Sequence, residues 1–208
     1  MKKAAFFDID STLIKGDAAS YFGRHLLAKG IATPFIVMKL VYYTILFKIG
    51  RLNVREAMIK NSFFTGGHTV EKYNTEAQEA FDKYMKFKIY KETADRLEDL
   101  RKKGYLIVIA SSGLCYIAEP LSDFLKSDFF IATEMEIKDG IVTGIPLEQI
   151  PYGEGKLDAI EALSEKEEID LSESFFFSDS IVDLPVFEKL GNCVAVNPDK
   201  KLRKLALK

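Results

Sequence analysis

Cysteine and histidine are scarce in this chain of 208 residues. Its two cysteines, Cys115 and Cys193, lie in apolar contexts and form no motif. We therefore expect them to be small core residues rather than parts of a disulfide or a metal site. With only two histidines, His25 and His68, a histidine-based zinc site is not expected either. These shortages argue against a fold held together by disulfides or zinc.

A large excess of charge of one sign is also absent. The 29 basic and 31 acidic side chains are interspersed and give a net charge of −2, so no basic surface for nucleic acid is expected. The sequence also lacks an internal repeat, a low-complexity tract and a cleavable secretory signal. We expect a cytoplasmic enzyme with one good core and an accessory module, and the oligomeric state stays open.

The longest apolar segment is too short to cross a bilayer. Residues 34–49 (PFIVMKLVYYTILFKI) are interrupted by Lys39 and Lys48, whereas a membrane span needs about 20 apolar residues. A buried helix or a subunit contact is the favoured interpretation. A groove for a lipid-like phosphate ester, or a membrane contact, is the less expected alternative.

Two aspartates follow the first apolar run. Residues 4–7 (AAFF) are typical of a buried parallel strand, and open α/β sheets place their chemistry at the carboxyl ends of such strands. If extended geometry persists, Asp8 and Asp10 point the same way, into one cleft. Neighbouring carboxylates repel, so the pair indicates a cation, a shared proton or two different roles. An Asp-rich turn without chemistry is the alternative interpretation.

A second apolar run, residues 175–177 (FFF), also ends near acids. Pro185 suits the first turn of a helix that begins near residue 180. Asp179 then lies at the end of the strand and Asp183 about one helical turn further on, so the two can converge. Magnesium binds one or two protein carboxylates and keeps room for water and phosphate. Acids that merely favour the start of a helix are the alternative.

Two weaker signals lie between the acidic segments. The apolar run 105–110 ends in Ser111, Ser112 and Gly113, and hydroxyls at the start of the next helix suit an anion. An ordinary Ser-rich helix cap is the alternative. Lys156 lies at the start of another predicted helix, where the helix dipole disfavours a cation. Burial beside carboxylates and a phosphate would explain that position, although a solvated lysine is the default.

The order of these motifs is more specific than any one of them. The chain reads strand-Asp-x-Asp-x-Thr, strand-Ser, Lys and strand-Asp-x-x-x-Asp. This set resembles the haloacid dehalogenase superfamily of phosphohydrolases, over essentially the whole chain. Residues 179–185 (DSIVDLP) and 195–199 (AVNPD) are similar to its subfamily IB, which contains phosphoserine phosphatases. Ser180 stands where many members carry glycine. The acid at Asp10 favours a phosphatase over a dehalogenase, because a departing alkoxide benefits from protonation.

The resemblance implies a role for each matching residue. Asp8 would be the nucleophile that forms an aspartyl-phosphate, and Asp10 the general acid for the alcohol and then the base for water. Magnesium would be held by the Asp8 carboxylate, the Asp10 backbone carbonyl and Asp179, with Asp183 supporting the site. The implied phosphate-binding residues are Ser111, Ser112, Gly113 and Lys156.

The predicted architecture is α/β, a Rossmann-like parallel sheet flanked by helices with an inserted helical cap of the C1 type. Residues 1–14 and 89–208 form the predicted core, because strands and helices alternate in the second half of the chain. Residues 15–88 form the predicted cap, with room for four helices. Residues 134–137 and 141–144 flank an Asp-Gly turn that favours a hairpin. A cap over the cleft would exclude water on closing.

The expected function is magnesium-dependent hydrolysis of a small phosphomonoester similar to phosphoserine. In phosphoserine phosphatases an acid and a base in the cap read the ammonium and carboxylate of the substrate, and Asp17, Arg51 and Arg55 are candidates here. Asp17 is one methylene shorter than the usual glutamate, so an amino-alcohol phosphate or a lysophospholipid stays open. Phosphotransfer to an alcohol acceptor is a further alternative, and a non-catalytic phosphate-binding module is the least expected one.

Overall fold

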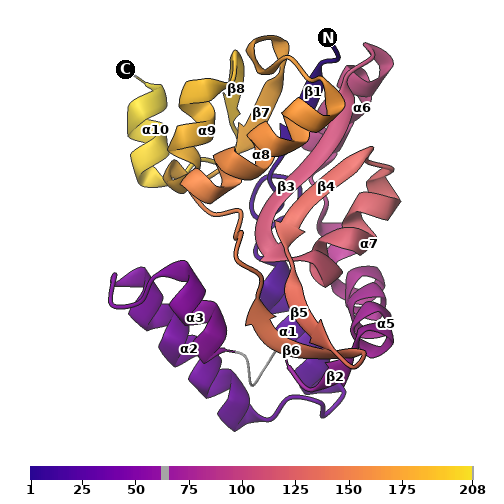
Figure 1. Ribbon diagram of the computed structural model, residues 1–208, viewed down its shortest axis with the longest axis vertical. Coiled ribbons are helices and arrows are strands. Elements are labelled where there is room, and N and C mark those ends of the chain that lie inside the picture. Colours follow the sequence, from indigo (N-terminus) through magenta and orange to yellow (C-terminus); the bar gives the residue numbers. More distant parts are fainter. Residues whose placement is uncertain (62–65, 208) are drawn as a thin grey trace.

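The computed structural model describes residues 1–61 and 66–207. Its largest sheet has the strand order β4-β3-β1-β7-β8, and every pairing in it is parallel (Figure 1). The strands are β1 (Ala4–Phe7), β3 (Leu106–Leu114), β4 (Phe129–Thr133), β7 (Phe175–Ser178) and β8 (Asn192–Ala195). The predicted α/β class is confirmed.

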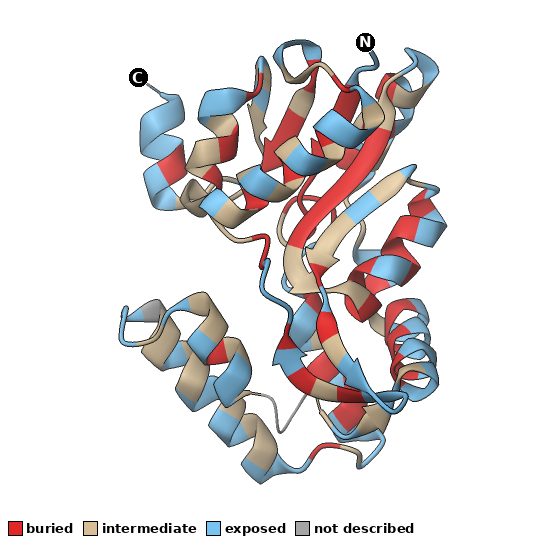
Figure 2. Cartoon of the chain, in the orientation of Figure 1, coloured by how far each residue is buried: buried red, intermediate tan, exposed pale blue. Residues whose placement is uncertain are grey.

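Alternation along β1 divides the core into two layers. Ala5 and Phe7 belong to the cluster that includes α6 (Lys91–Lys102) and α7 (Cys115–Leu125). Ala4 and Phe6 belong to the cluster on the other face. Helices α8 (Glu154–Glu167) and α9 (Leu184–Lys189) cover that second face, and the short α10 (Lys200–Ala206) follows β8. Figure 2 shows the resulting buried strands between partly exposed helices. Burial on both faces explains why these strands read as continuous apolar runs.

The segment between β1 and α6 is mainly helical. It contains α1 (Ala18–Ala28), α2 (Pro34–Lys48), α3 (Val54–Lys60) and α5 (Val70–Ala80), followed by a π-helical turn (Phe81–Met85) and a 3-10 turn (Lys86–Lys88). Helix α5 packs between α1 and α7, whereas the α2–α3 hairpin projects away from the large sheet (Figure 1).

A small antiparallel sheet joins this helical segment to the second half of the chain. It has the order β2-β6-β5, with β2 (His68–Thr69), β6 (Ile141–Pro146) and β5 (Met135–Lys138). The predicted hairpin is present as β5–β6, and its turn residues Asp139 and Gly140 both have positive φ, as a type I′ turn requires. The pairing of β2 with β6 escaped the sequence analysis, because two residues carry no usable periodicity.

Two expectations about burial are wrong. Cys193 is exposed rather than a core residue, because it lies on β8, the edge strand of the large sheet. Helix α2 is not a buried helix, since its described side chains are half-buried or exposed (Figure 2), and the subunit contact expected as the other possibility stays a prediction. Within the described parts of the chain, no helix combines the length and the apolar character that crossing a membrane requires.

Candidate active site

The loop after β1 holds Asp8 and Asp10 at the carboxyl end of the sheet. The Asp8 amide donates to the Phe177 carbonyl at 2.9 Å, so Asp8 continues the strand ladder. The Asp10 Oδ1 accepts from the Ala18 amide at 2.8 Å, which joins the loop to the start of α1. On the other side, the Asn197 side chain donates to the Ser11 carbonyl at 2.8 Å. Contacts from distant segments therefore fix this loop.

Lys156 forms a buried ion pair with two aspartates. Its Nζ donates to Asp8 Oδ1 at 2.9 Å and to Asp183 Oδ2 at 2.8 Å, and only 3% of its side chain is exposed. It lies in the first turn of α8, where Gly155 permits a close approach, because a Cβ there would collide with the Ile150 carbonyl. Neutralisation by the two carboxylates explains a lysine at this end of a helix.

Asp183 and Asp179 come from the segment after β7. The Ser178 hydroxyl donates to Asp183 Oδ2 at 2.6 Å, so Asp183 faces Lys156 with two donors on one oxygen. Asp183 closes a 3-10 turn (Ile181–Asp183) and α9 begins at the next residue, slightly later than the sequence predicts. Asp179 is half-buried at the end of the strand.

Burial and repulsion dominate the electrostatics of this site. Burial raises the pKa of Asp10 to about 7, and Asp17 adds to the rise. Burial also raises the pKa of Asp179 to about 6, with help from Asp8. Burial raises the pKa of Asp8 above its usual range, and Lys156 opposes that rise. For Lys156 burial acts to lower the pKa, but the charges of Asp8 and Asp183 outweigh it and raise the pKa.

The donor atoms at this site fit magnesium. The carboxylates of Asp8 and Asp179 and the backbone carbonyl of Asp10 offer oxygen only, which is the ligand type that magnesium prefers. Burial raises the pKa of both Asp8 and Asp179, and repulsion from Asp183 adds to the rise at Asp8, as repulsion from Asp8 does at Asp179. A divalent cation held by these carboxylates would offset that repulsion.

The Ser-Ser-Gly segment lies in a strand rather than at the start of a helix. β3 extends through Leu114, with an irregular register against β4, and α7 begins only at Cys115. The predicted helix-start position is therefore wrong, because pairing with β4 prolongs the strand. Ser111 is buried and accepts from the Gly113 amide at 3.0 Å, and the Ser112 carbonyl accepts from Thr133 at 2.8 Å.

A cavity of about 300 Å³ opens between this site and the α2–α3 hairpin. Asp10, Ser112 and Gly113 line it on the core side, and α2 and α3 contribute mainly apolar side chains. Phe47 of α2 reaches Tyr152 just before α8, with ring centroids 5.6 Å apart. Sequence reasoning missed these cavity residues, because a helix of nearly uniform apolarity gives no signal for which face turns inward.

The three candidate substrate-binding residues of the cap have separate positions. Asp17 lines the cavity, but its carboxylate also caps α1 by accepting from the Ser20 amide at 2.6 Å. Arg55 donates to the Leu147 carbonyl at 2.8 Å and so ties α3 to the segment after β6. Arg51 is exposed between α2 and α3. Asp17 is among the described residues that line the cavity, whereas Arg51 and Arg55 are not.

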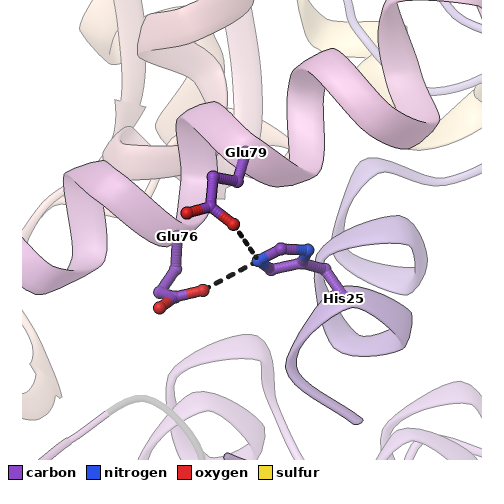
Figure 3. A group of neighbouring side chains, drawn as sticks. All are labelled: His25, Glu76 and Glu79. Carbon is purple, nitrogen blue, oxygen red and sulfur yellow. Dashed lines mark hydrogen bonds and ion pairs between the residues drawn. The ribbon is translucent and has the colours of Figure 1, made fainter. Parts of the chain in front are cut away.

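A second group of charged side chains lies between α1 and α5 (Figure 3). We call His25, Lys29, Glu76 and Glu79 the α1–α5 cluster. His25 Nε2 lies 2.7 Å from Glu76 and 3.7 Å from Glu79. Lys29 Nζ lies 2.6 Å from Glu79 and 3.1 Å from Glu76. The lysine ammonium group therefore already supplies the positive charge that a metal ion would bring to the two glutamates. This geometry favours a structural ion-pair group over a metal centre.

Comparison with known proteins identifies the family of this chain and the class of its fold. The family model of the haloacid dehalogenase-like hydrolases matches residues 5–188. The chain is 30% identical to the inhibition of morphological differentiation protein of Streptomyces azureus, over 99% of this chain and 76% of the other. It is also 30% identical to a Mycobacterium tuberculosis protein named phosphoserine phosphatase SerB1, over 98% of this chain and 67% of the other.

A solved structure shares the whole fold. The crystal structure of a Bordetella pertussis protein of unknown function superposes with a TM-score of 0.91 at 21% identity, and covers 100% of this chain and 95% of the other. The family model and the phosphatase-named relative define a phosphatase-type hydrolase. The chain belongs to the haloacid dehalogenase-like hydrolase family, which confirms the resemblance seen in its sequence motifs.

Proposed function

We propose that this protein hydrolyses small phosphomonoesters in a magnesium-dependent reaction that passes through a phosphoryl group on Asp8. The observation that carries the proposal is the convergence of separate chain segments on one end of the sheet. Asp8 and Asp10 follow β1, Lys156 starts α8, and Asp179 and Asp183 follow β7. A lysine buried between two aspartates is a costly arrangement that a phosphate site explains.

The first half of the reaction transfers the phosphoryl group to the protein. A carboxylate oxygen of Asp8 attacks phosphorus, and the bond from phosphorus to the alcohol oxygen breaks. Asp10 gives its proton to the departing alkoxide, so the alcohol leaves neutral. The raised pKa of Asp10 suits this role, because a carboxyl that stays partly protonated near neutral pH is able to donate.

The second half returns the protein to its starting state. Asp10, now a carboxylate, accepts a proton from a water molecule whose oxygen attacks the phosphorus of aspartyl-phosphate. The bond between phosphorus and Asp8 breaks, inorganic phosphate leaves, and Asp10 is again protonated. The Ala18 amide donates to Asp10 Oδ1 at 2.8 Å and so orients the carboxyl group that takes and gives the proton.

Neighbouring groups supply the charge and hydrogen bonds that phosphoryl transfer requires. Magnesium bound by Asp8, the Asp10 carbonyl and Asp179 would supply Lewis-acid stabilisation of the phosphate oxygens. Lys156 offsets repulsion between the Asp8 carboxylate and the phosphate, and Asp183 holds Lys156 in place at 2.8 Å. The proposed phosphate-binding groups of β3 are Ser111, Ser112 and Gly113.

Phosphoserine is the first ester to test. The name of the M. tuberculosis relative, phosphoserine phosphatase SerB1, supports a substrate of this kind. Asp17 at the cavity is a candidate partner for a substrate ammonium group.

The proposal is tested by phosphate release from a panel of esters, measured with magnesium and with a chelator. The panel contains phosphoserine, phosphoethanolamine, p-nitrophenyl phosphate and ethyl phosphate. A rapid acid quench followed by peptide mapping looks for phosphate on Asp8. We expect magnesium-dependent release and a labelled Asp8 peptide. No release from any ester, or label on another residue, would contradict the proposal. Transfer to added glycerol with little release into water would instead indicate a phosphotransferase.

A further inference from the structure

The cavity beside Asp10 is lined mainly by hydrocarbon. Phe22, Leu40, Phe47, Val54, Met58 and Ile117 contribute to its wall. The same cavity reaches Asp10, Ser112 and Gly113 at its core side, where the phosphate ester is proposed to react. The alcohol part of a bound ester therefore extends into an apolar space of about 300 Å³.

The cavity lining offers few charged side chains that could bind the ammonium and carboxylate groups of phosphoserine. No lysine or arginine is among the described residues that line the cavity. Arg55 donates to the Leu147 carbonyl at 2.8 Å and is not part of the cavity lining. A substrate carboxylate in this space would lose water without gaining a described cationic partner, and that desolvation disfavours binding. A hydrocarbon chain would gain from the same surroundings.

Helix α2 is apolar on its outer face as well. Leu40, Thr44 and Phe47 turn toward the cavity, whereas Met38 and Val41 are 62% and 52% exposed. Residues 33–61, which include α2 and α3, carry five basic side chains and one acid, a net charge of +4 in a chain of net charge −2. Figure 1 shows this hairpin at the outside of the molecule. An apolar and basic surface beside the cavity complements an anionic amphiphile.

We propose that the substrate is an amphiphilic phosphomonoester, whose alcohol part carries a hydrocarbon chain that lies in the cavity between α2–α3 and the core. This inference rests on the proposed phosphomonoesterase function and names its substrate class. Two sources supply such an ester, monomers in solution and a lipid surface, and both present the same chemistry to the cavity.

The test measures kcat/KM for ethyl, hexyl and decyl phosphate below their aggregation concentrations, with phosphoserine alongside. Each methylene that enters the cavity should raise kcat/KM by roughly four-fold until the space is filled. We expect decyl phosphate to exceed ethyl phosphate by roughly 100-fold or more, and to exceed phosphoserine. Similar values for all chain lengths, or a preference for phosphoserine, would overturn the inference and leave the proposed function intact. No hydrolysis of any ester would overturn both.

Neighbouring residues of α2 provide matched variants. Leu40→Asn places an amide in the cavity and should lower the ratio of decyl to ethyl kcat/KM by roughly ten-fold. Val41→Asn places the same amide on the outer face of α2 and should leave that ratio as in the wild type. An equal effect of both variants would contradict a role for the cavity, and circular dichroism checks that both keep their helices.

A final arm separates the two sources of substrate. Phosphate release is measured from lysophosphatidate as monomers and in anionic phosphatidylglycerol vesicles. If Val41→Asn lowers the rate of phosphate release from vesicles but not from monomers, the substrate is taken from a lipid surface. Equal rates for Val41→Asn and the wild type on vesicles would indicate uptake from solution. Either result supports the amphiphilic substrate class, whereas no hydrolysis in either form, with short esters still cleaved, contradicts it.

Discussion

The carboxylates around Asp8 and those of the α1–α5 cluster differ in how their charge is balanced. Both groups are partly or fully buried between separate segments of the chain. In the α1–α5 cluster two glutamates face His25 and Lys29. In the other group, which we call the Asp8 cluster (Asp8, Asp10, Asp179, Asp183 and Lys156), Lys156 is the described cation in contact with the aspartates. Four carboxylates therefore share one lysine in the Asp8 cluster, whereas the two carboxylates of the α1–α5 cluster face both a lysine and a histidine.

The pKa values reflect this difference. Burial acts to raise the pKa of Glu76, but hydrogen bonds from His25 and Lys29 outweigh it and lower the pKa. In the Asp8 cluster, burial and like charge raise the pKa of Asp10 to about 7 and of Asp179 to about 6. Excess negative charge beside a cavity is typical of a functional site, whereas glutamates that are held by nearby hydrogen-bond donors stabilise helix packing. Variants of both clusters test this distinction.

The largest expected effect is that of Asp8→Asn. The amide keeps the size of the side chain and removes the attacking carboxylate, so phosphate release should fall by roughly 10⁴-fold or more. Initial rates on p-nitrophenyl phosphate and near-wild-type circular dichroism provide the measurement. Asp95→Asn, an exposed change on α6, serves as the matched control and should leave the rate unchanged. Wild-type turnover by Asp8→Asn would contradict the nucleophile assignment.

Asp10→Asn should have a large effect that depends on the leaving group. Loss of the proton donor should slow the hydrolysis of ethyl phosphate by roughly 10²- to 10⁴-fold. With p-nitrophenyl phosphate, the rate of the first half of the reaction should fall less, because nitrophenolate leaves without a proton. Single-turnover rates of Asp8 phosphorylation compare the two esters. Equal losses on both esters would indicate that Asp10 positions groups rather than transferring a proton.

Asp179→Asn should weaken magnesium binding and leave the fold intact. Removal of one anionic ligand should raise the magnesium concentration for half-maximal rate by roughly 10- to 100-fold. Glu79→Gln is the control from the α1–α5 cluster and should keep the wild-type magnesium response. A shift in Glu79→Gln equal to that in Asp179→Asn would remove the proposed distinction between the two clusters.

Features of the fold and site that depend on local patterns were predictable from the sequence. Buried apolar runs followed by acids identified β1 and β7, and the Asp139-Gly140 pair identified the β5–β6 turn. The position of Lys156 at a helix start was also visible, and two distant aspartates now account for it. In each of these cases the information lies in a few consecutive residues of the sequence.

Features that depend on long-range pairing were not predictable. The extension of β3 past Ser111 requires β4, and the strand β2 exists only through its pairing with β6. Likewise, the hydrogen bond from Arg55 to a carbonyl 92 positions away in the chain was not visible in the sequence, and its candidate role in substrate binding stays a prediction. Composition identifies which groups are available, and tertiary contacts decide which of them remain available for a ligand.

The smallest expected effect is on stability, from Glu76→Gln. Loss of charge-assisted hydrogen bonds to His25 and Lys29 should lower the free energy of unfolding by about 1.5–3 kcal/mol at pH 7. Because the folded-state pKa of Glu76 is lowered, its contribution is complete above the usual pKa near 4.5 and is lost as pH falls through the folded-state value. Urea unfolding at pH 7 and at lower pH should therefore show the difference from wild type shrinking on acidification. Glu79→Gln, at a more exposed position on the same helix, should cost less. A difference that stays constant with pH would mean that packing, rather than charge, gives Glu76 its role, and the contrast with the Asp8 cluster would then lie in the active site alone.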